Sequence, residues 1–281
     1  MDILQEIAQR TKERIEEKKK TRPLEQIMEQ LDPTAVRGLT QNPSSFDKWR
    51  GTLSQSQDYG SFPFEKALKC NDIALICEIK KASPSKGVIS DKFPYLEIAR
   101  EYESAGASAI SVLTEPFFFK GCDRYLQEIA GAVKIPLLRK DFTVDSYMIY
   151  EAKLLGASAV LLICAISDKD TLAEYISIAH SLGLSALVEA HTEDEVAMAL
   201  SAGARIIGIN NRNLKTFQVD ITLSERLRRL VPPEIIFVSE SGITQHGDIV
   251  KLRDINADAA LIGESLMKSG DITKAIEALI I

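Results

Sequence analysis

Short apolar runs alternate with longer amphipathic segments over most of the chain. The runs are rich in Val, Ile, Leu and Ala and suit buried strands, whereas the segments between them repeat apolar residues at three- and four-residue spacing, as helices with one buried face do. Such alternation predicts a parallel sheet covered by helices. The runs fall within residues 73–80, 104–115, 134–140, 154–164, 184–190, 201–211, 234–240 and 255–265.

The alternation itself repeats. At four boundaries, near residues 104, 154, 201 and 255, small residues close a helix and an apolar run follows at once. Their spacing of about 50 residues corresponds to two strand–helix units. Four such double units fit a closed (β/α)₈ TIM barrel better than an open doubly wound sheet, and no G-x-G-x-x-G motif follows the first run.

Residues 1–68 do not follow this repeat. They are interpreted as one long helix, a middle part rich in Pro and Gln, and a short helix in the stretch "PFEKALK". We therefore expect a single α/β domain, in which residues 69–281 form the barrel and residues 1–68 form an N-terminal helical extension packed on it. The three lysines at 18–20 are expected to be the solvated end of the first helix.

Polar side chains gather where the predicted strands end. In this kind of barrel the carboxyl ends of the strands meet at one mouth, where ligands bind and chemistry occurs. Glu78 and Lys80 end the first run and share one face by the two-residue alternation of a strand. The polar residues that end five further runs are Lys140 with Asp141, Glu189, Asn210 with Arg212, Glu240 with Ser241, and Glu264. Burial after long apolar runs is expected to shift the pKa values of the acid and base among them.

Two glycines predict a phosphate site. Gly242 and Gly263 follow the seventh and eighth runs, and in such barrels the loops after strands seven and eight often bind phosphate through backbone N–H groups. Glycine allows the backbone to approach an anion closely. The expected ligand is therefore a small anionic molecule that carries phosphate.

The composition of the chain argues against nucleic-acid, membrane and metal partners. The net charge of −6, with acids and bases interspersed, gives no basic patch for nucleic acid. No run approaches the roughly 20 apolar residues of a membrane span, and the N-terminus lacks a signal-peptide core, so a soluble cytoplasmic protein is expected. The four cysteines form no CxxC pair, and the three histidines lack metal-ligand spacing, so no metal site is predicted. His180, His191 and His246 are expected at the surface or at helix ends.

At the strand ends the sequence resembles the indole-3-glycerol phosphate synthase family. The matching stretches follow in order over about residues 70–270 and include "CEIKKASPSKG", "IPLLRKDF", "LVEAHTEDE", "IGINNRNLKTF", "VSESGI" and "LIGESLM". This family of the tryptophan pathway closes the indole ring of 1-(2-carboxyphenylamino)-1-deoxy-D-ribulose 5-phosphate with loss of carbon dioxide and water. The resemblance implies that fold and activity for the chain, without a metal or organic cofactor.

The resemblance also implies roles for individual side chains. Lys140 would be the general acid that protonates the substrate carbonyl, and Glu189 the general base of the later dehydration. Lys80 would hold the anthranilate carboxylate and share the role of proton donor, and an ammonium of lowered pKa is expected for this acid work. The other implied positions are Glu78 and Asn210 for positioning, Arg212, Ser83 and Ser241 for substrate contact, Phe142 with Phe118 or Phe119 as an apolar wall, and the backbone at Gly242, Gly263 and Glu264 for phosphate.

Two positions depart from the usual pattern of the family. Lys120-Gly121-Cys122 stands where relatives often have Gln-Gly-Ser, and Glu264 stands where many have a small hydroxyl residue. A carboxylate that faces phosphate is unfavourable, so any phosphate contact by Glu264 is expected from its backbone N–H.

Two other functions stay open on the residues alone. One is another phosphate-binding barrel enzyme, either a sugar-phosphate isomerase or an aldolase that forms a Schiff base on Lys140 or Lys80. The other is a non-catalytic barrel that binds a sugar phosphate, although a binder needs no proton donor and would not require Lys80, Lys140 and Glu189 together. A monomer is compatible with the sequence, and a partner enzyme of the same pathway stays open.

Overall fold

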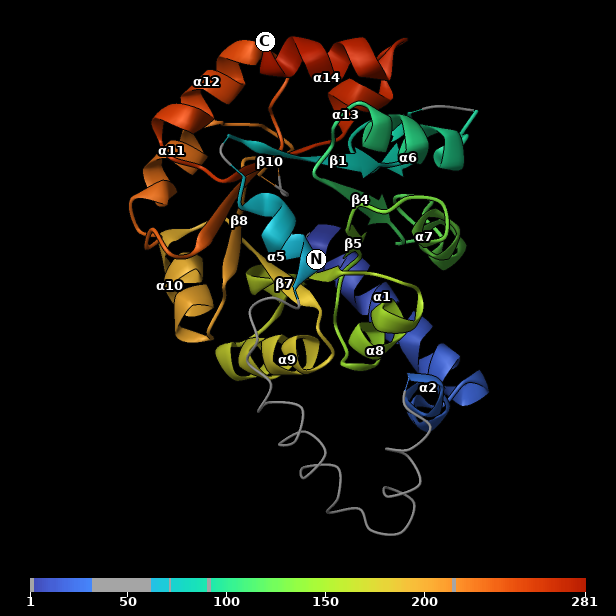
Figure 1. Ribbon diagram of the computed structural model, residues 1–281. Coiled ribbons are helices and arrows are strands. Elements are labelled where there is room, and N and C mark those ends of the chain that lie inside the picture. Colours follow the sequence, from blue (N-terminus) through green and yellow to red (C-terminus); the bar gives the residue numbers. More distant parts are fainter. Residues whose placement is uncertain (1–2, 32–61, 71, 90–91, 214–215) are drawn as a thin grey trace.

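Eight parallel strands close into a barrel in the computed structural model of the protein (Figure 1). The structure describes residues 3–31, 62–70, 72–89, 92–213 and 216–281. The barrel strands are β1 (Ala74–Ile79), β4 (Ala109–Leu113), β5 (Leu137–Lys140), β6 (Ala159–Ile163), β7 (Ser185–Ala190), β8 (Ile206–Asn210), β9 (Ile236–Glu240) and β10 (Ala259–Ile262). Strand β1 pairs with both β4 and β10, which closes the ring. The predicted (β/α)₈ barrel is confirmed.

Helices surround the barrel in the order that the periodicity predicts. They are α6 (Tyr95–Ser104), α7 (Asp123–Ala130), α8 (Tyr147–Leu154), α9 (Lys169–Ser181), α10 (Glu193–Ser201), α11 (Thr222–Arg228) and α12 (His246–Asp254). The prediction lacked the two helices after β10, α13 (Glu264–Met267) and α14 (Ile272–Ile280). It also lacked the 3-10 turn η2 (Cys164–Ile166) and a hairpin in the loop after β1, made by β2 (Ala82–Ser83) and β3 (Gly87–Val88).

Alternation along each strand divides the buried residues into two cores. In β1, Ala74 and Ile76 belong to the core inside the barrel, whereas Leu75, Cys77 and Ile79 belong to the layer between strands and helices. The same alternation sends the next even-numbered side chain, Glu78, to the inside of the barrel. The strand pattern thus decides which polar residues reach the mouth.

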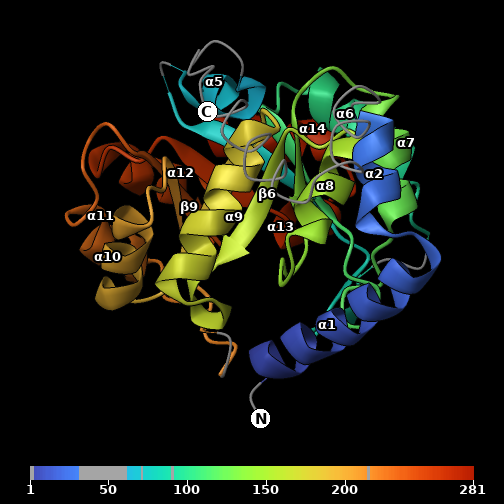
Figure 2. The ribbon, with the colours of Figure 1, turned by 90° about the horizontal axis from the view of Figure 1, so that it is seen from below.

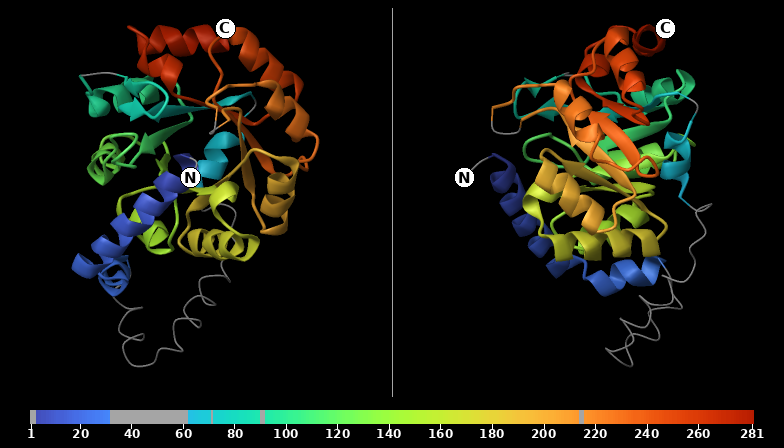
Figure 3. Two further views of the ribbon diagram at one scale, coloured as in Figure 1. Left: turned by 180° about the vertical axis from the view of Figure 1, so that it is seen from behind. Right: turned by 90° about the vertical axis from the view of Figure 1, so that its left-hand side faces the viewer.

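The N-terminal extension contacts both ends of the barrel. Helix α1 (Ile3–Thr21) crosses the mouth, and α5 (Pro63–Leu68) packs at the opposite end, where Phe64 and Leu68 join the inner core (Figures 2 and 3). A second helix, α2 (Leu24–Leu31), follows a break at Arg22 and Pro23. The predicted long helix is present as α1, whereas α2 was not predicted. Pro23 separates the two helices, because it lacks an N–H and disfavours helix in the residue before it. The Pro- and Gln-rich middle lies outside the described residues.

Two of the three lysines at the end of α1 bind the barrel instead of water. Lys18 Nζ lies 2.5 Å from a carboxylate oxygen of Asp123 and 2.6 Å from one of Glu151, and Lys19 Nζ lies 2.6 Å from Asp145. The expectation of a solvated helix end was wrong for both. The three acids lie more than a hundred residues away along the chain, so these contacts cannot be predicted from the local charge pattern.

Candidate active site

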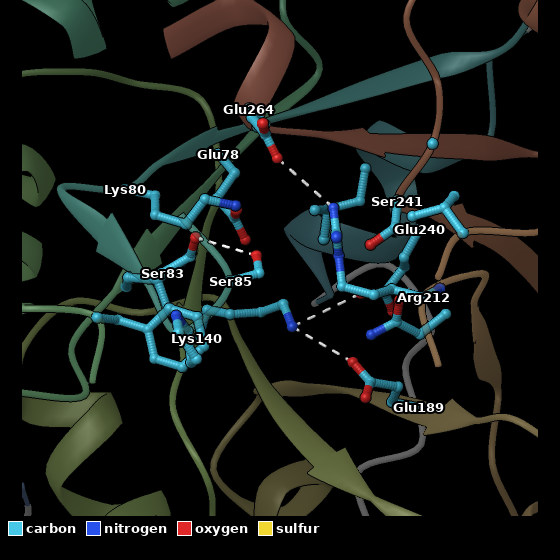
Figure 4. A pocket seen from close by; sticks show the side chains of 18 of the residues that line it. Glu78, Lys80, Ser83, Ser85, Lys140, Glu189, Arg212, Glu240, Ser241 and Glu264 are labelled. Atoms are coloured by element: carbon cyan, nitrogen blue, oxygen red, sulfur yellow. Dashed lines mark hydrogen bonds and ion pairs between the residues drawn. The ribbon is translucent and has the colours of Figure 1, made fainter. Parts of the chain in front are cut away.

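A cavity of about 490 Å³ opens at the carboxyl ends of the strands (Figure 4). Apolar side chains of α1, namely Ile3, Leu4 and Ile7, form part of its wall. Every residue assigned a role by the resemblance, apart from Phe118, also lines it: Glu78, Lys80, Ser83, Phe119, Lys140, Phe142, Glu189, Asn210, Arg212, Ser241, Gly242, Gly263 and Glu264. The structure therefore brings these residues together in one cavity and adds their partners.

The residues on either side of Lys140 fasten the end of β5. Arg139 is buried and donates hydrogen bonds to Asp123, Glu151 and a backbone carbonyl of α8. Asp141 is 1% exposed and accepts two hydrogen bonds from the Arg14 guanidinium of α1, at 2.9 and 3.0 Å, and one from the Thr114 hydroxyl at 2.7 Å. Both side chains bind helices or the neighbouring strand, so Lys140 between them is held pointing into the cavity.

Lys140 lies among carboxylates. Its Nζ is 3.3 Å from Glu189 Oε2 and 3.6 Å from Glu240 Oε2. Burial alone would lower the pKa of Lys140, but the negative charges of Glu189, Glu240 and Glu78 outweigh burial and raise it above the usual value. The predicted lowering of this pKa was wrong, because Glu240 was not foreseen as a partner of the lysine.

Glu189 has a different neighbour on each carboxylate oxygen. Oε2 faces Lys140, whereas Oε1 lies 3.6 Å from His191 Nε2. Burial would raise the pKa of Glu189, but Lys140, His191 and a hydrogen bond with Asn210 together lower it. Glu189 is therefore a carboxylate at neutral pH, as a base must be. His191 was expected to be an isolated surface or capping residue, and its place beside Glu189 contradicts that.

Glu240 is the side chain of this cluster that received no role from the sequence. It is 1% exposed, and Oε1 is buried without a hydrogen-bond partner in the part of the chain that the structure describes. Burial raises its pKa to about 8, with Glu189 and Glu78 adding to the rise and Lys140 opposing it. A Cβ on Gly208 of the neighbouring strand would lie 2.2 Å from Oε1, so this glycine makes room for the carboxyl group.

The raised pKa of Glu240 predicts a pH dependence of stability. Between pH 4.5 and about 8 the unfolded chain releases this proton while the folded chain keeps it, so the stabilisation is complete below pH 4.5 and is lost as the pH rises through 8. We expect Glu240→Gln to remove this loss, which for one proton amounts to at most about 1.4 kcal/mol per pH unit. Urea unfolding of both proteins from pH 5 to 8 measures it, and parallel curves would contradict it.

Glu78 and Lys80 form an ion pair at the end of β1. Lys80 Nζ lies 2.5 Å from Glu78 Oε1, and only 15% of the lysine side chain is exposed. A Cβ on Gly263 would lie 2.5 Å from the same oxygen and 3.1 Å from Glu78 Cβ. A side chain at position 263 would therefore collide with Glu78. This steric requirement explains the glycine independently of the predicted phosphate contact.

Cations and strained backbone lie at the rim near Gly242 and Glu264. Lys268 Nζ lies 2.7 Å from Glu264 Oε1, and Arg212 Nη2 lies 3.5 Å from Oε2 (Figure 4). The hydrogen bond from Lys268 keeps the pKa of Glu264 below its usual value. Ser241 and Gly242 both adopt positive φ, 67° and 86°, which turns the chain sharply after β9. The carboxylate of Glu264 is therefore paired with cations on this side of the cavity.

Phenylalanines provide the apolar wall. The rings of Phe119 and Phe142 lie 6.2 Å apart and both line the cavity. Phe118 packs instead against α1, where the Arg10 guanidinium carbon lies over the Phe118 ring, 5.5 Å from the ring centre. Gly121, in the stretch that departs from the family pattern, is required because a Cβ would lie 2.4 Å from the Leu113 carbonyl oxygen.

Within residues 3–31, 62–70, 72–89, 92–213 and 216–281, no group of three or more His, Cys, Asp or Glu side chains could hold a metal ion. Over the same ranges, no helix is long and apolar enough to cross a membrane.

Known proteins with similar sequences point to one family. A family model described as indole-3-glycerol phosphate synthase matches residues 4–279. The indole-3-glycerol phosphate synthase of Ruminiclostridium cellulolyticum is 62% identical over 227 residues, which cover 81% of this chain and 87% of the relative. That of Lachnoclostridium phytofermentans is 46% identical over 269 residues, covering 96% and 95%.

A solved structure shows the fold alone. The 3-hexulose-6-phosphate synthase of Salmonella typhimurium superposes with a TM-score of 0.62 at 12% identity, covering 74% of this chain and 96% of that one. Fold likeness at such low identity does not identify an activity. The family model and the two close relatives do, and the chain belongs to the indole-3-glycerol phosphate synthase family.

Proposed function

We propose that the cavity carries out the family's reaction by general acid–base catalysis. The reaction closes the indole ring of 1-(2-carboxyphenylamino)-1-deoxy-D-ribulose 5-phosphate with loss of carbon dioxide and water. The observation that carries this proposal is the placement of Lys140 between Glu189 and Glu240, in a cavity that also contains Lys80. One strongly held ammonium beside a carboxylate provides an acid and a base within reach of one substrate.

In the first step Lys140 protonates the carbonyl oxygen of the ribulose part while the ring carbon attacks the carbonyl carbon. The raised pKa of Lys140 keeps the ammonium charged at neutral pH, so it stabilises the negative charge that develops on this oxygen. Loss of the carboxylate as carbon dioxide then restores the aromatic ring. Lys80 protonates the leaving hydroxyl group, and Glu189 takes the proton that dehydration releases.

The cavity also orients the two anionic ends of a flexible substrate. Lys80 holds the carboxylate next to the Phe119 and Phe142 wall, and the rim with Arg212 and the backbone at Gly242, Gly263 and Glu264 takes the phosphate. Holding both ends favours the reactive geometry and contributes to rate without further chemistry. Glu78 positions Lys80, Asn210 positions Glu189, and Ser83 and Ser241 contact the substrate.

Gly263→Ala tests the steric role of Gly263. Its Cβ would displace the Glu78 carboxylate and with it Lys80, so we expect kcat to fall about 10-fold or more while the inorganic phosphate affinity changes little. Steady-state kinetics and phosphate inhibition measure the two effects. Gly270→Ala, where a Cβ meets nothing within 4 Å, is the matched control. A large loss of phosphate affinity with normal kcat would contradict this role.

A Schiff-base aldolase is the alternative that the structure disfavours. Schiff-base formation requires a neutral amine, whereas the carboxylates around Lys140 raise its pKa and keep it protonated. Borohydride added during turnover should therefore leave the protein mass unchanged. A reduced adduct on Lys140 or Lys80 would overturn the acid–base scheme.

We also propose a cytoplasmic location and a single domain for this enzyme. A substrate with a phosphate and a carboxylate does not cross membranes unaided, which supports a cytoplasmic location. The extension and the barrel act as one domain, because Ile3, Leu4 and Ile7 of α1 complete the cavity that the barrel opens.

A further inference from the structure

A line of titratable side chains leads from Lys140 to the surface without passing through the cavity. Glu189 faces Lys140 with Oε2 at 3.3 Å and His191 Nε2 with Oε1 at 3.6 Å. On its other side, His191 Nδ1 lies 3.4 Å from Glu195 Oε2. Side-chain exposure rises outward along this line, from 2% in Glu189 to 15% in His191 and 20% in Glu195.

The position of His191 is fixed by the start of α10. Its backbone N–H donates to Glu195 Oε2 at 2.6 Å, and the Thr192 hydroxyl caps the helix by accepting from the Glu195 N–H at 3.2 Å. The imidazole Nε2 is buried and makes no hydrogen bond within the described residues. The ring is thus held with one nitrogen toward Glu189 and the other toward Glu195.

The charges around His191 come from several elements. Burial would lower its pKa, but the hydrogen bond with Glu195 and the charges of Glu189 and Glu195 outweigh burial and raise it. On η2, burial raises the pKa of the Cys164 thiol to about 12, so this neighbour is neutral, and Lys140 stands behind Glu189. The imidazole therefore gains a proton readily near neutral pH.

The proposed chemistry needs such a supply of protons. One proton is consumed per turnover, because the substrate enters as a carboxylate and carbon dioxide leaves neutral. Lys140 and Lys80 each donate a proton and Glu189 recovers only one, so the second must come from water. Phe119, Phe142 and the apolar side chains of α1 line the same cavity as Lys140, and a substrate that fills this cavity displaces the water that would otherwise reach the lysine.

We propose that His191 relays a proton from water to Lys140 through Glu189, with Glu195 as the outer group. The inference rests on the proposed function. A proton enters at Nδ1 beside Glu195, the imidazolium passes its Nε2 proton to Glu189 Oε1, and rotation of the carboxyl group presents that proton to the neutral Lys140 amine. Lysine regains its charge, Glu189 returns to the carboxylate, and the imidazole is left neutral with its proton on Nδ1. Exchange with water, which releases this proton and supplies one to Nε2, returns the ring to its first tautomer.

Replacement of His191 tests this relay through kinetics that a structural role would not reproduce. Decarboxylation is irreversible and precedes the recharging of Lys140, so His191→Ala should lower kcat about 10-fold or more and leave kcat/KM nearly unchanged. A single turnover with excess enzyme uses protons already on the lysines and should stay fast. Added imidazole should restore kcat, since it can enter the space left by the ring.

The controls separate this inference from the function itself. His246→Gln makes a similar change at a histidine that does not line the cavity and should leave all rates unchanged, and His191→Gln keeps much of the side-chain volume in case His191→Ala is unstable. An unchanged kcat in both His191 variants would overturn the relay. So would an equal fall in kcat and kcat/KM without rescue by imidazole. Failure of the proposed function would instead show as an inactive parent protein.

Discussion

Lys140→Ala is expected to abolish turnover while the barrel stays folded. The substitution removes the ammonium that protonates and polarises the substrate carbonyl. In the folded protein this ammonium nitrogen, Lys140 Nζ, lies 3.3 Å from Glu189 Oε2. Loss of a general acid usually costs about 10²- to 10⁴-fold in rate, and loss of charge stabilisation at the same atom adds to it. We therefore expect kcat to fall by at least about 10⁴-fold, measured by continuous assay of indole product.

The same substitution also has a structural consequence that must be separated from catalysis. It leaves Glu78, Glu189 and Glu240 with less positive charge nearby, so Glu189 loses the main cause of its low pKa. Circular dichroism and thermal unfolding check the fold. Lys153→Ala, which removes an exposed lysine of α8 that does not line the cavity, is the control and should remain active. Wild-type turnover in Lys140→Ala would refute the assignment of the acid.

Glu189→Gln is expected to stop the reaction late. The amide keeps the shape of the side chain but cannot accept the proton released in dehydration, whereas ring closure and decarboxylation depend on Lys140. In a single turnover, carbon dioxide should appear at a substantial rate while the indole product forms about 10²- to 10⁴-fold more slowly. Rapid-quench measurement of both products follows the two steps. If the two appeared together at one reduced rate, Glu189 would act before decarboxylation.

The residues of the cavity could be predicted because they follow local rules. Alternation along β1 places Glu78 and Lys80 toward one space, and the helix-to-strand boundaries locate the ends of the other strands. Such patterns depend on neighbours in the sequence. They were sufficient for the barrel and for the polar residues at its strand ends, but not for Ile3, Leu4 and Ile7 of α1, which also line the cavity.

The interactions among those residues could not be predicted in the same way. The direction of the pKa shift of Lys140 is the balance of burial against the carboxylates of Glu189, Glu240 and Glu78. These residues lie 49, 100 and 62 residues away from Lys140 along the chain, respectively. Its sign therefore depends on the closed barrel. The contacts of Lys18 with α7 and α8 and of His191 with Glu189 likewise require the tertiary fold.

Closure of the indole ring in this cavity can be measured directly. The experiment adds 1-(2-carboxyphenylamino)-1-deoxy-D-ribulose 5-phosphate to the purified protein and follows the fluorescence of indole-3-glycerol phosphate. We expect a steady rise in indole fluorescence, with one carbon dioxide released per product formed, and no rise with Lys140→Ala. Absence of indole fluorescence with the folded parent protein would contradict it.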